Sequence, residues 1–128
     1  MKRDEVMAMT DEELRIRAAE LDGFEFVGRT GWDNPGSSEW MSHPWVRDNT
    51  GFRNVPDYPN DIAAAWGLVE RLQEMWLYPE VQNVGLHGYL WNVWLDFPGE
   101  TDSALVAQDE NVKRAITKAF ILAMEAND

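Results

Sequence analysis

The chain has 128 residues, the size of one ordinary domain, and no cysteine, which excludes disulfides and thiolate metal sites. Its formal net charge of −12 argues against a general nucleic-acid binder and against an anionic membrane surface, because both need positive side chains. No apolar run approaches the roughly 20 residues that span a bilayer. The charged start over residues 1–5 has no apolar stretch behind it, so we do not expect a secretory signal.

The first strongly predicted helix covers residues 11–22, after a weakly helical start over residues 1–9. Thr10 and Glu13 have the spacing of a capping box, in which each side chain accepts a hydrogen bond from the other residue's backbone N–H. Gly23 follows the last apolar residue, where a left-handed helix stop is expected. The alternation that begins at Phe24 predicts a short strand over residues 24–27.

Between residues 28 and 60 the apolar residues follow neither helical nor strand periodicity. This segment is rich in Gly, Pro, Asn, Asp and Ser and also carries three Trp and three Arg residues. An irregular segment of this length is uncommon inside a compact domain and is often functional. The alternative is a short hairpin around Glu39–Val46.

A helix is predicted over residues 61–76, with Asp57 or Asn60 as its cap and Pro79 preventing its continuation. The residues spaced to form its apolar face are Ile62, Ala65, Trp66, Val69, Leu72 and Trp76.

Residues 81–97 are predicted to form the sheet, with Gly85 and Gly88 marking a bend or a hairpin. In its second strand the odd positions Tyr89, Trp91, Val93, Leu95 and Phe97 share one face, and the even positions Leu90, Asn92, Trp94 and Asp96 share the other.

A final strand is expected over residues 104–108, and Asp109 is expected to cap a helix over residues 110–126. The inward positions of this helix are Val112, Ile116, Ala119, Phe120 and Ala123.

The strands are too few and too close together for parallel crossovers. The order therefore predicts one α+β domain over residues 1–128, with an antiparallel sheet packed between helices as an α-β-α sandwich.

Catalytic machinery is not evident in the sequence. His43 and His87 have no metal-binding spacing, Ser37 and Ser38 lie in a loop without a nucleophile elbow, and no phosphate-binding glycine motif is present. We therefore expect no enzyme, no metal site and no cofactor. Asp and Glu are abundant, so a catalytic carboxylate pair of the kind used on glycosides stays an open alternative.

Two groups of residues could instead bind a ligand. In residues 29–53, indoles could stack a base while arginines hold a phosphate; the alternative is that these Trp residues cover the sheet or a subunit contact. On the even face of the predicted strand, Asn92, Trp94 and Asp96 could read a base or a ribose. The alternative there is an ordinary solvated face.

Three segments of the chain resemble the bacteriophage ABA sandwich family: residues 9–23 (MTDEELRIRAAELDG), 55–66 (VPDYPNDIAAAW) and 113–123 (KRAITKAFILA). The resemblance implies an α–β–α sandwich encoded by a phage or prophage. One characterised member of the family is a sponge of the Thoeris anti-defence type, which sequesters cyclic ADP-ribose isomers made by host immune TIR enzymes without degrading them. Relatives are linked to cyclic oligonucleotide signals, so a related cyclic nucleotide is the other ligand that the resemblance implies. Such sponges are oligomers with pockets shared between protomers.

Carried onto this sequence, the resemblance implies a homo-oligomeric sponge that acts in the cytoplasm of the infected bacterium. The family's closing motif reads Ala-Ile-x-Arg-Ala, whereas here Lys118 replaces the Arg, keeping the charge but losing the bidentate fork. The expected ligand-binding residues are Arg29, Arg47, Arg53, Asn92, Trp94, Asp96, Arg114 and Lys118. The alternatives are a protein that inhibits a host protein by direct contact, a nucleotide hydrolase, and an accessory protein without a ligand.

Overall fold

The computed structural model describes residues 3–28, 45–48, 51–54, 56–84, 88, 90–97 and 104–126. The elements are, in chain order, α1 (Arg3–Met7), α2 (Asp11–Leu21), β1 (Glu25–Gly28), β2 (Trp45–Asp48), β3 (Gly51–Asn54), α4 (Ile62–Glu74), β4 (Glu80–Val84), β5 (Leu90–Leu95), β6 (Ala104–Asp109) and α5 (Val112–Ala126). The fold is α+β with antiparallel sheets, as the sequence pattern predicts.

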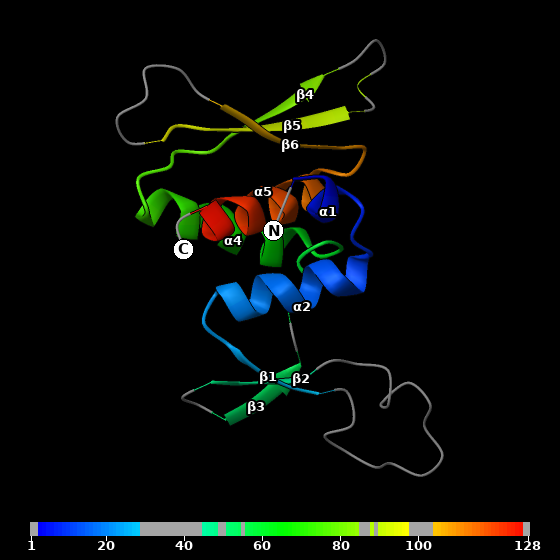
Figure 1. Cartoon of the computed structure of the whole chain (residues 1–128), viewed down its shortest axis with the longest axis vertical. Helices are drawn as coiled ribbons and strands as arrows, with labels where there is room; N and C mark the ends of the chain where they lie inside the picture. The colour runs from blue at the N-terminus through cyan, green and yellow to red at the C-terminus, as the bar shows by residue number, and fades with distance from the viewer. Residues whose placement is uncertain are drawn as a thin grey trace.

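Helix α5 lies at the centre of the molecule (Figure 1). The β4–β5–β6 sheet covers one side of it, and α1, α2 and α4 pack around its other sides. The β1–β2–β3 sheet lies beyond α2 (Figure 1). The described helices all lie on one side of β4–β5–β6, so the sheet has an inner face toward α5 and an outer face away from it. The predicted α-β-α layering, with the sheet packed between helices, is therefore not found in the described residues, whose helices lie between two sheets (Figure 1).

Helix α2 begins and ends as its sequence predicts. The Thr10 hydroxyl accepts from the Glu13 N–H at 3.2 Å, and the Glu13 carboxylate accepts from the Thr10 N–H at 3.1 Å. At the other end Gly23 has φ +97°, the Gly23 N–H donates to Glu20 O, and the Phe24 N–H donates to Ala19 O. This pair of bonds is a Schellman motif, with glycine at its left-handed position.

The predicted irregular segment holds an antiparallel hairpin. Strand β2 pairs with β3, with Trp45 opposite Asn54, and β1 pairs with β2 on its other side. The alternative hairpin around Glu39–Val46 falls mostly outside the described residues, and the described hairpin pairs β2 with β3, with Asp48 opposite Gly51. Residues 29–44 lie outside the described part of the chain.

Helix α4 differs from its prediction at both its cap and its face. The cap is Asp61, whose carboxylate accepts from the Ala63 N–H at 3.0 Å, while Asp57 and Asn60 form the preceding turn. Three of the six predicted inward residues are wrong: the exposed fractions of Ile62, Trp66 and Trp76 are 53%, 51% and 68%. The helix buries instead Ala65, Leu68, Val69 and Leu72.

Strands β4, β5 and β6 form an antiparallel meander. Val93 and Leu95 are buried on the inner face, and Trp91 and Phe97 pack against the same core, as the alternation predicts. A bulge at Val106 interrupts the β5–β6 register, since Val93 pairs with Ala107 but Trp94 pairs with Leu105.

Helix α5 is capped by Asn111 rather than by Asp109. The Asn111 side chain accepts from the backbone N–H of Lys113 at 2.9 Å, whereas Asp109 ends β6 and accepts from the Asn111 N–H. The predicted inward positions Ile116, Ala119, Phe120 and Ala123 are buried, and Val112 is partly buried against them.

Gly88, between β4 and β5, allows a stability prediction. Its φ is +69°, and an added Cβ would lie 2.6 Å from Asn83 Oδ1, whose Nδ2 donates to Gly88 O at 2.8 Å. Gly88→Ala is expected to lower the free energy of unfolding by about 2–3 kcal/mol, from the left-handed backbone and the displaced amide. Urea unfolding followed by circular dichroism measures it.

The matched control is Gly67→Ala, on α4, where an added Cβ meets nothing within 4 Å. It is expected to raise stability by about 0.5–1 kcal/mol, because Ala favours a helix over Gly. Equal stability of Gly88→Ala and the native chain would contradict the assignment of strain to Gly88.

Candidate functional site

The outer face of β4–β5–β6 carries a row of amide side chains across its three strands. Asn92 in the central strand pairs with Gln82 of β4 and with Gln108 of β6. Directly paired residues of an antiparallel sheet lie on the same face, so the three amides form one row.

Asn92 is the buried member of this row, because it is only 8% exposed whereas Gln82 and Gln108 are exposed. Its Oδ1 accepts from Gln108 Nε2 at 2.8 Å. Within the described residues its Nδ2 has no partner, so a nearly buried amide keeps two unused N–H donors. Buried donors without protein partners are rare in native structures, and a bound water or a ligand can complete them.

Trp94 lies next to this row on the outer face. It pairs with Glu80 of β4 and with Leu105 of β6, at the point where the Val106 bulge shifts the register. The indole is half-buried. Asp96 lies just beyond the strand and is exposed, and its backbone N–H donates to Leu77 O at 2.8 Å.

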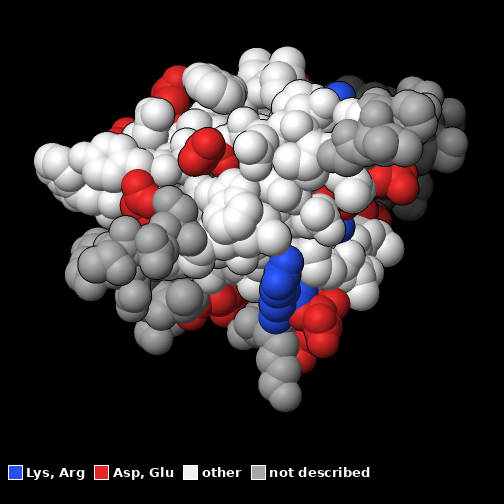
Figure 2. All heavy atoms as spheres, turned by 90° about the horizontal axis from the view of Figure 1, so that it is seen from above, with Lys and Arg blue, Asp and Glu red and all other residues white. Residues whose placement is uncertain are grey.

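The outer face is seen from above in Figure 2. Uncharged side chains dominate the centre of this view, Asp and Glu side chains are scattered around it, and Lys or Arg side chains are visible toward its lower edge. The sequence explains this distribution: Arg71 is the only Lys or Arg between Arg53 and Lys113, whereas this stretch holds ten Asp and Glu residues.

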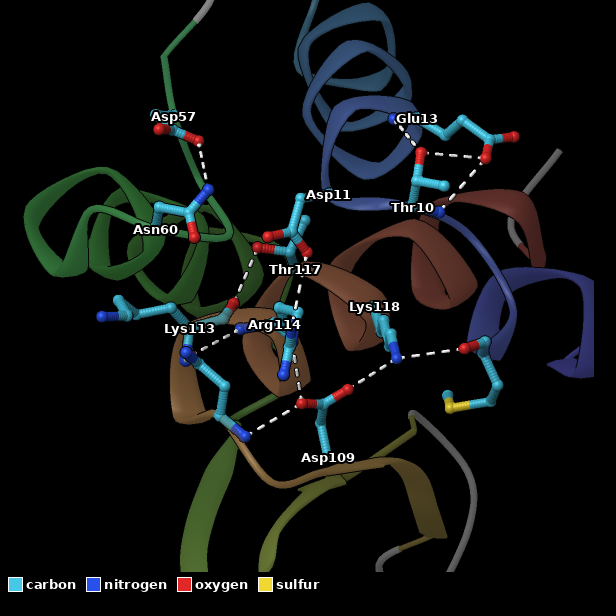
Figure 3. A network of polar contacts seen from close by, with 12 residues as sticks. Thr10, Asp11, Glu13, Asp57, Asn60, Asp109, Lys113, Arg114, Thr117 and Lys118 are labelled. Atoms are coloured by element: carbon cyan, nitrogen blue, oxygen red, sulfur yellow. Dashed lines mark hydrogen bonds and ion pairs between the residues drawn. The ribbon is translucent and has the colours of Figure 1, made fainter.

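The basic residues Arg114 and Lys118 lie elsewhere, in a network centred on Asp109 (Figure 3). Lys118 Nζ donates to Asp109 Oδ2 at 2.6 Å and to Met7 O at 3.1 Å. Arg114 Nε donates to Asp109 Oδ1 at 3.0 Å, and Arg114 also forms an ion pair with Asp11. The network joins β6 and α5 to α1 and to the start of α2.

Burial of the Asp109 carboxyl opposes its ionisation, but hydrogen bonds from Lys118, the Asn111 N–H and Arg114 outweigh this and lower the pKa of Asp109. In the same way, the hydrogen bond from Arg17 is the main cause that lowers the pKa of Glu125.

The eight predicted binding residues are therefore only partly brought together. Asn92 and Trp94 share the outer face, with Asp96 at its edge, while Asp109, the partner of Arg114 and Lys118, lies opposite inner-face Trp91. The backbones of Arg47 and Arg53 lie in β2 and β3, their side chains are outside the described part, and so is Arg29. The sequence prediction missed Gln82 and Gln108, which only the strand register identifies as neighbours of Asn92.

The model of the phage ABA sandwich domain matches residues 8–121. The chain belongs to the phage ABA sandwich family. No curated protein and no solved structure matches it. The predicted family membership is thus confirmed, whereas the resemblance to the Thoeris anti-defence sponges stays a prediction.

In this ABA sandwich chain the closing motif, Ala115 to Ala119, is buried throughout. Lys118 is 6% exposed and already holds Asp109 and Met7 O, so the geometry gives it a structural contact. Its contact with a phosphate stays a prediction.

Two further findings, on metal ligands and on membrane-spanning helices, concern the described residues only. No three of their His, Asp and Glu side chains are grouped so that they could hold a metal ion. None of their helices has both the length and the apolar character needed to cross a membrane.

The lowered pKa values predict a loss of stability in acid. A carboxyl whose pKa is lower in the folded state stabilises the fold above its unfolded pKa of about 4, and this contribution disappears as the pH falls through the folded pKa. The free energy of unfolding is therefore expected to fall with pH below about 4. Urea titrations at several pH values measure it, and Asp109→Asn should flatten the profile. An unchanged profile in this variant would contradict the role given to Asp109.

Proposed function

We propose that this phage ABA sandwich protein is an anti-defence sponge. It binds a nucleotide-derived immune signal, such as a cyclic ADP-ribose isomer, on the outer face of β4–β5–β6 and sequesters it without cleaving it. The observation that carries the proposal is the nearly buried Asn92, whose two Nδ2 N–H donors have no partner among the described residues, beside the half-buried Trp94. The cytoplasm of the infected bacterium is the proposed place of action.

The residues of this face suit a base and a ribose. The Trp94 indole offers an aromatic plane on which a base can stack. Asn92 Nδ2 offers donors and Gln108 Oε1 an acceptor, a pairing that matches the edge of a base. Asp96 at the end of the strand can accept from ribose hydroxyls.

The negative charge of a diphosphate must be neutralised by basic residues from outside this face. Between Arg53 and Lys113 only Arg71 is basic, and Arg71 is bound to Asp22 and Glu74. The cations of the site are therefore proposed to be Arg29, Arg47 and Arg53 of a second protomer in a homo-oligomer, since β2 and β3 of the same chain lie beyond α2, far from this face (Figure 1).

The experiment is isothermal titration against cyclic ADP-ribose, its ribose-linked isomers, ADP-ribose, cyclic dinucleotides and NAD. Trp94→Ala is expected to weaken binding of the preferred compound about 5- to 150-fold, because a lost base stack costs about 1–3 kcal/mol. Trp66→Ala is the matched control, since this indole is exposed on α4 and away from the outer face.

Chromatography of each mixture then separates the alternatives. Intact ligand is expected after incubation, and recovery of a cleaved product would replace the sponge by a nucleotide hydrolase. Absence of binding to every compound would reject the sponge and leave direct inhibition of a host protein.

A further inference from the structure

Two aromatic side chains stand out from the surface just after α4. Trp76 is 68% exposed and Tyr78 is 51% exposed. Their ring centroids lie 6.0 Å apart and their planes meet at 81°. Two accessible rings at nearly a right angle form a corner, and such corners bind organic cations through the negative faces of the rings.

The backbone at Trp76 is one that favours glycine. The Trp76 N–H donates to Gln73 O and the Leu77 N–H donates to Leu72 O, which is the Schellman pattern also found after α2. At the equivalent left-handed position α2 has Gly23, with φ +97°, whereas α4 has Trp76, with φ +63°. Tyr78 is also left-handed, with φ +39°.

A bulky residue at this position is unfavourable, and the indole recovers little by burial because it is mostly exposed. Strain of this kind at an exposed aromatic residue is typical of a functional position. The same chain shows that glycine can end a helix in this way, so the indole itself is the feature that needs explanation.

Acidic residues flank the corner in the sequence. Glu74 precedes it, Glu80 follows it, and Asp96 is fixed beside it because its backbone N–H donates to Leu77 O at 2.8 Å. Glu74 forms an ion pair with Arg71, and no other Lys or Arg occurs between Arg53 and Lys113. Aromatic faces and acidic groups thus coincide in a part of the chain that is nearly without cations.

We propose that Trp76 and Tyr78, with Glu74, Glu80 and Asp96, form a docking surface for a Lys- or Arg-bearing segment of another protein. The cationic side chain stacks on the rings and pairs with the carboxylates. We take another protein as the occupant rather than a second copy of this chain, because the net charge of −12 on each copy disfavours contact between copies at an acidic surface. The rings of Trp76 and Tyr78 are not part of the proposed nucleotide site, but the two sites adjoin, because Asp96 belongs to both and Glu80 pairs with Trp94.

The test is titration of the full chain with the synthetic peptide Ac-Arg-Gly-Arg-Gly-Arg-NH2 and with its Glu counterpart. Binding of the Arg peptide alone is expected. Trp76→Gly is expected to weaken it about 5- to 30-fold, the range of a desolvated cation–π contact. Trp66→Ala, which removes another exposed indole and no charge, is expected to leave the affinity unchanged.

Thermal unfolding separates a binding role from a structural role. Trp76→Gly is expected to unfold at the same temperature as the native chain or a few degrees higher, since Gly suits the left-handed position. A fall in Tm of more than about 5 °C would show that the indole holds the fold, and would overturn the proposal.

Three other results would also overturn it. These are no binding of the Arg peptide, equal weakening by Trp66→Ala, and a native oligomer that Trp76→Gly converts to monomers in sedimentation. The last result would assign the corner to a second copy.

Discussion

Asp109→Ala is expected to lower the free energy of unfolding by about 3–5 kcal/mol, because it breaks a buried ion pair from one side. The Asp109 and Lys118 side chains are 11% and 7% exposed. Without the carboxylate, Lys118 keeps just one partner in the described part of the chain, the carbonyl oxygen of Met7, and holds an uncompensated charge. Urea unfolding at neutral pH, followed by circular dichroism, measures the loss.

The double variant Asp109→Ala with Lys118→Met is the control. It removes both charges and keeps much of the side-chain volume, and such replacements of buried pairs are often close to neutral. We therefore expect the double variant to regain at least about half of the lost stability. If the single and the double variant lose the same amount, the ion pair is not the cause.

Phe120→Ala is the second large expected effect. Phe120 lies on α5 and is completely buried. Removal of a buried phenyl ring costs about 3–5 kcal/mol, through lost burial and the cavity left behind. The same urea unfolding measurement applies.

Phe120→Leu separates the cavity from other causes. A swap between large apolar residues is expected to cost about 1.5 kcal/mol or less. Equal losses for the Ala and the Leu variants would show that ring shape, and not volume, is what the site requires.

The sequence predicts those parts of the fold that local chemistry determines. The Thr10–Glu13 capping box and Gly23 define α2 because both signals act within a few residues. The alternation around Val93 and Leu95 identifies the inner face of β5, since a buried strand face must be apolar.

The predicted face of α4 fails where two apolar stripes overlap. Both stripes share Ala65, Val69 and Leu72, and periodicity alone does not say whether Trp66 or Leu68 joins them. Packing against α5 buries Leu68 and leaves Trp66 exposed. That decision depends on tertiary contacts between segments about 50 residues apart, which periodicity does not report.

The candidate site also combines features that local sequence predicts with features that depend on tertiary contacts. Asn92 and Trp94 could be placed on one face from strand alternation, but their neighbours Gln82 and Gln108 depend on the register. The bulge at Val106 changes that register in a way that the sequence does not reveal. Asp109 resembled a helix cap because of its position, and its pairing with Lys118 follows only from the path of the chain after β6.

The central position of α5 has a consequence for how the protein folds during its synthesis on the ribosome. Its packing partners α1, α2, α4 and the β4–β5–β6 sheet all precede it in the chain. During synthesis these elements leave the exit tunnel with their apolar faces uncovered, and α5 is the last of them to emerge. The core can close only then, so we expect the nascent chain to depend on the rapid arrival of α5, or on chaperones, to avoid aggregation.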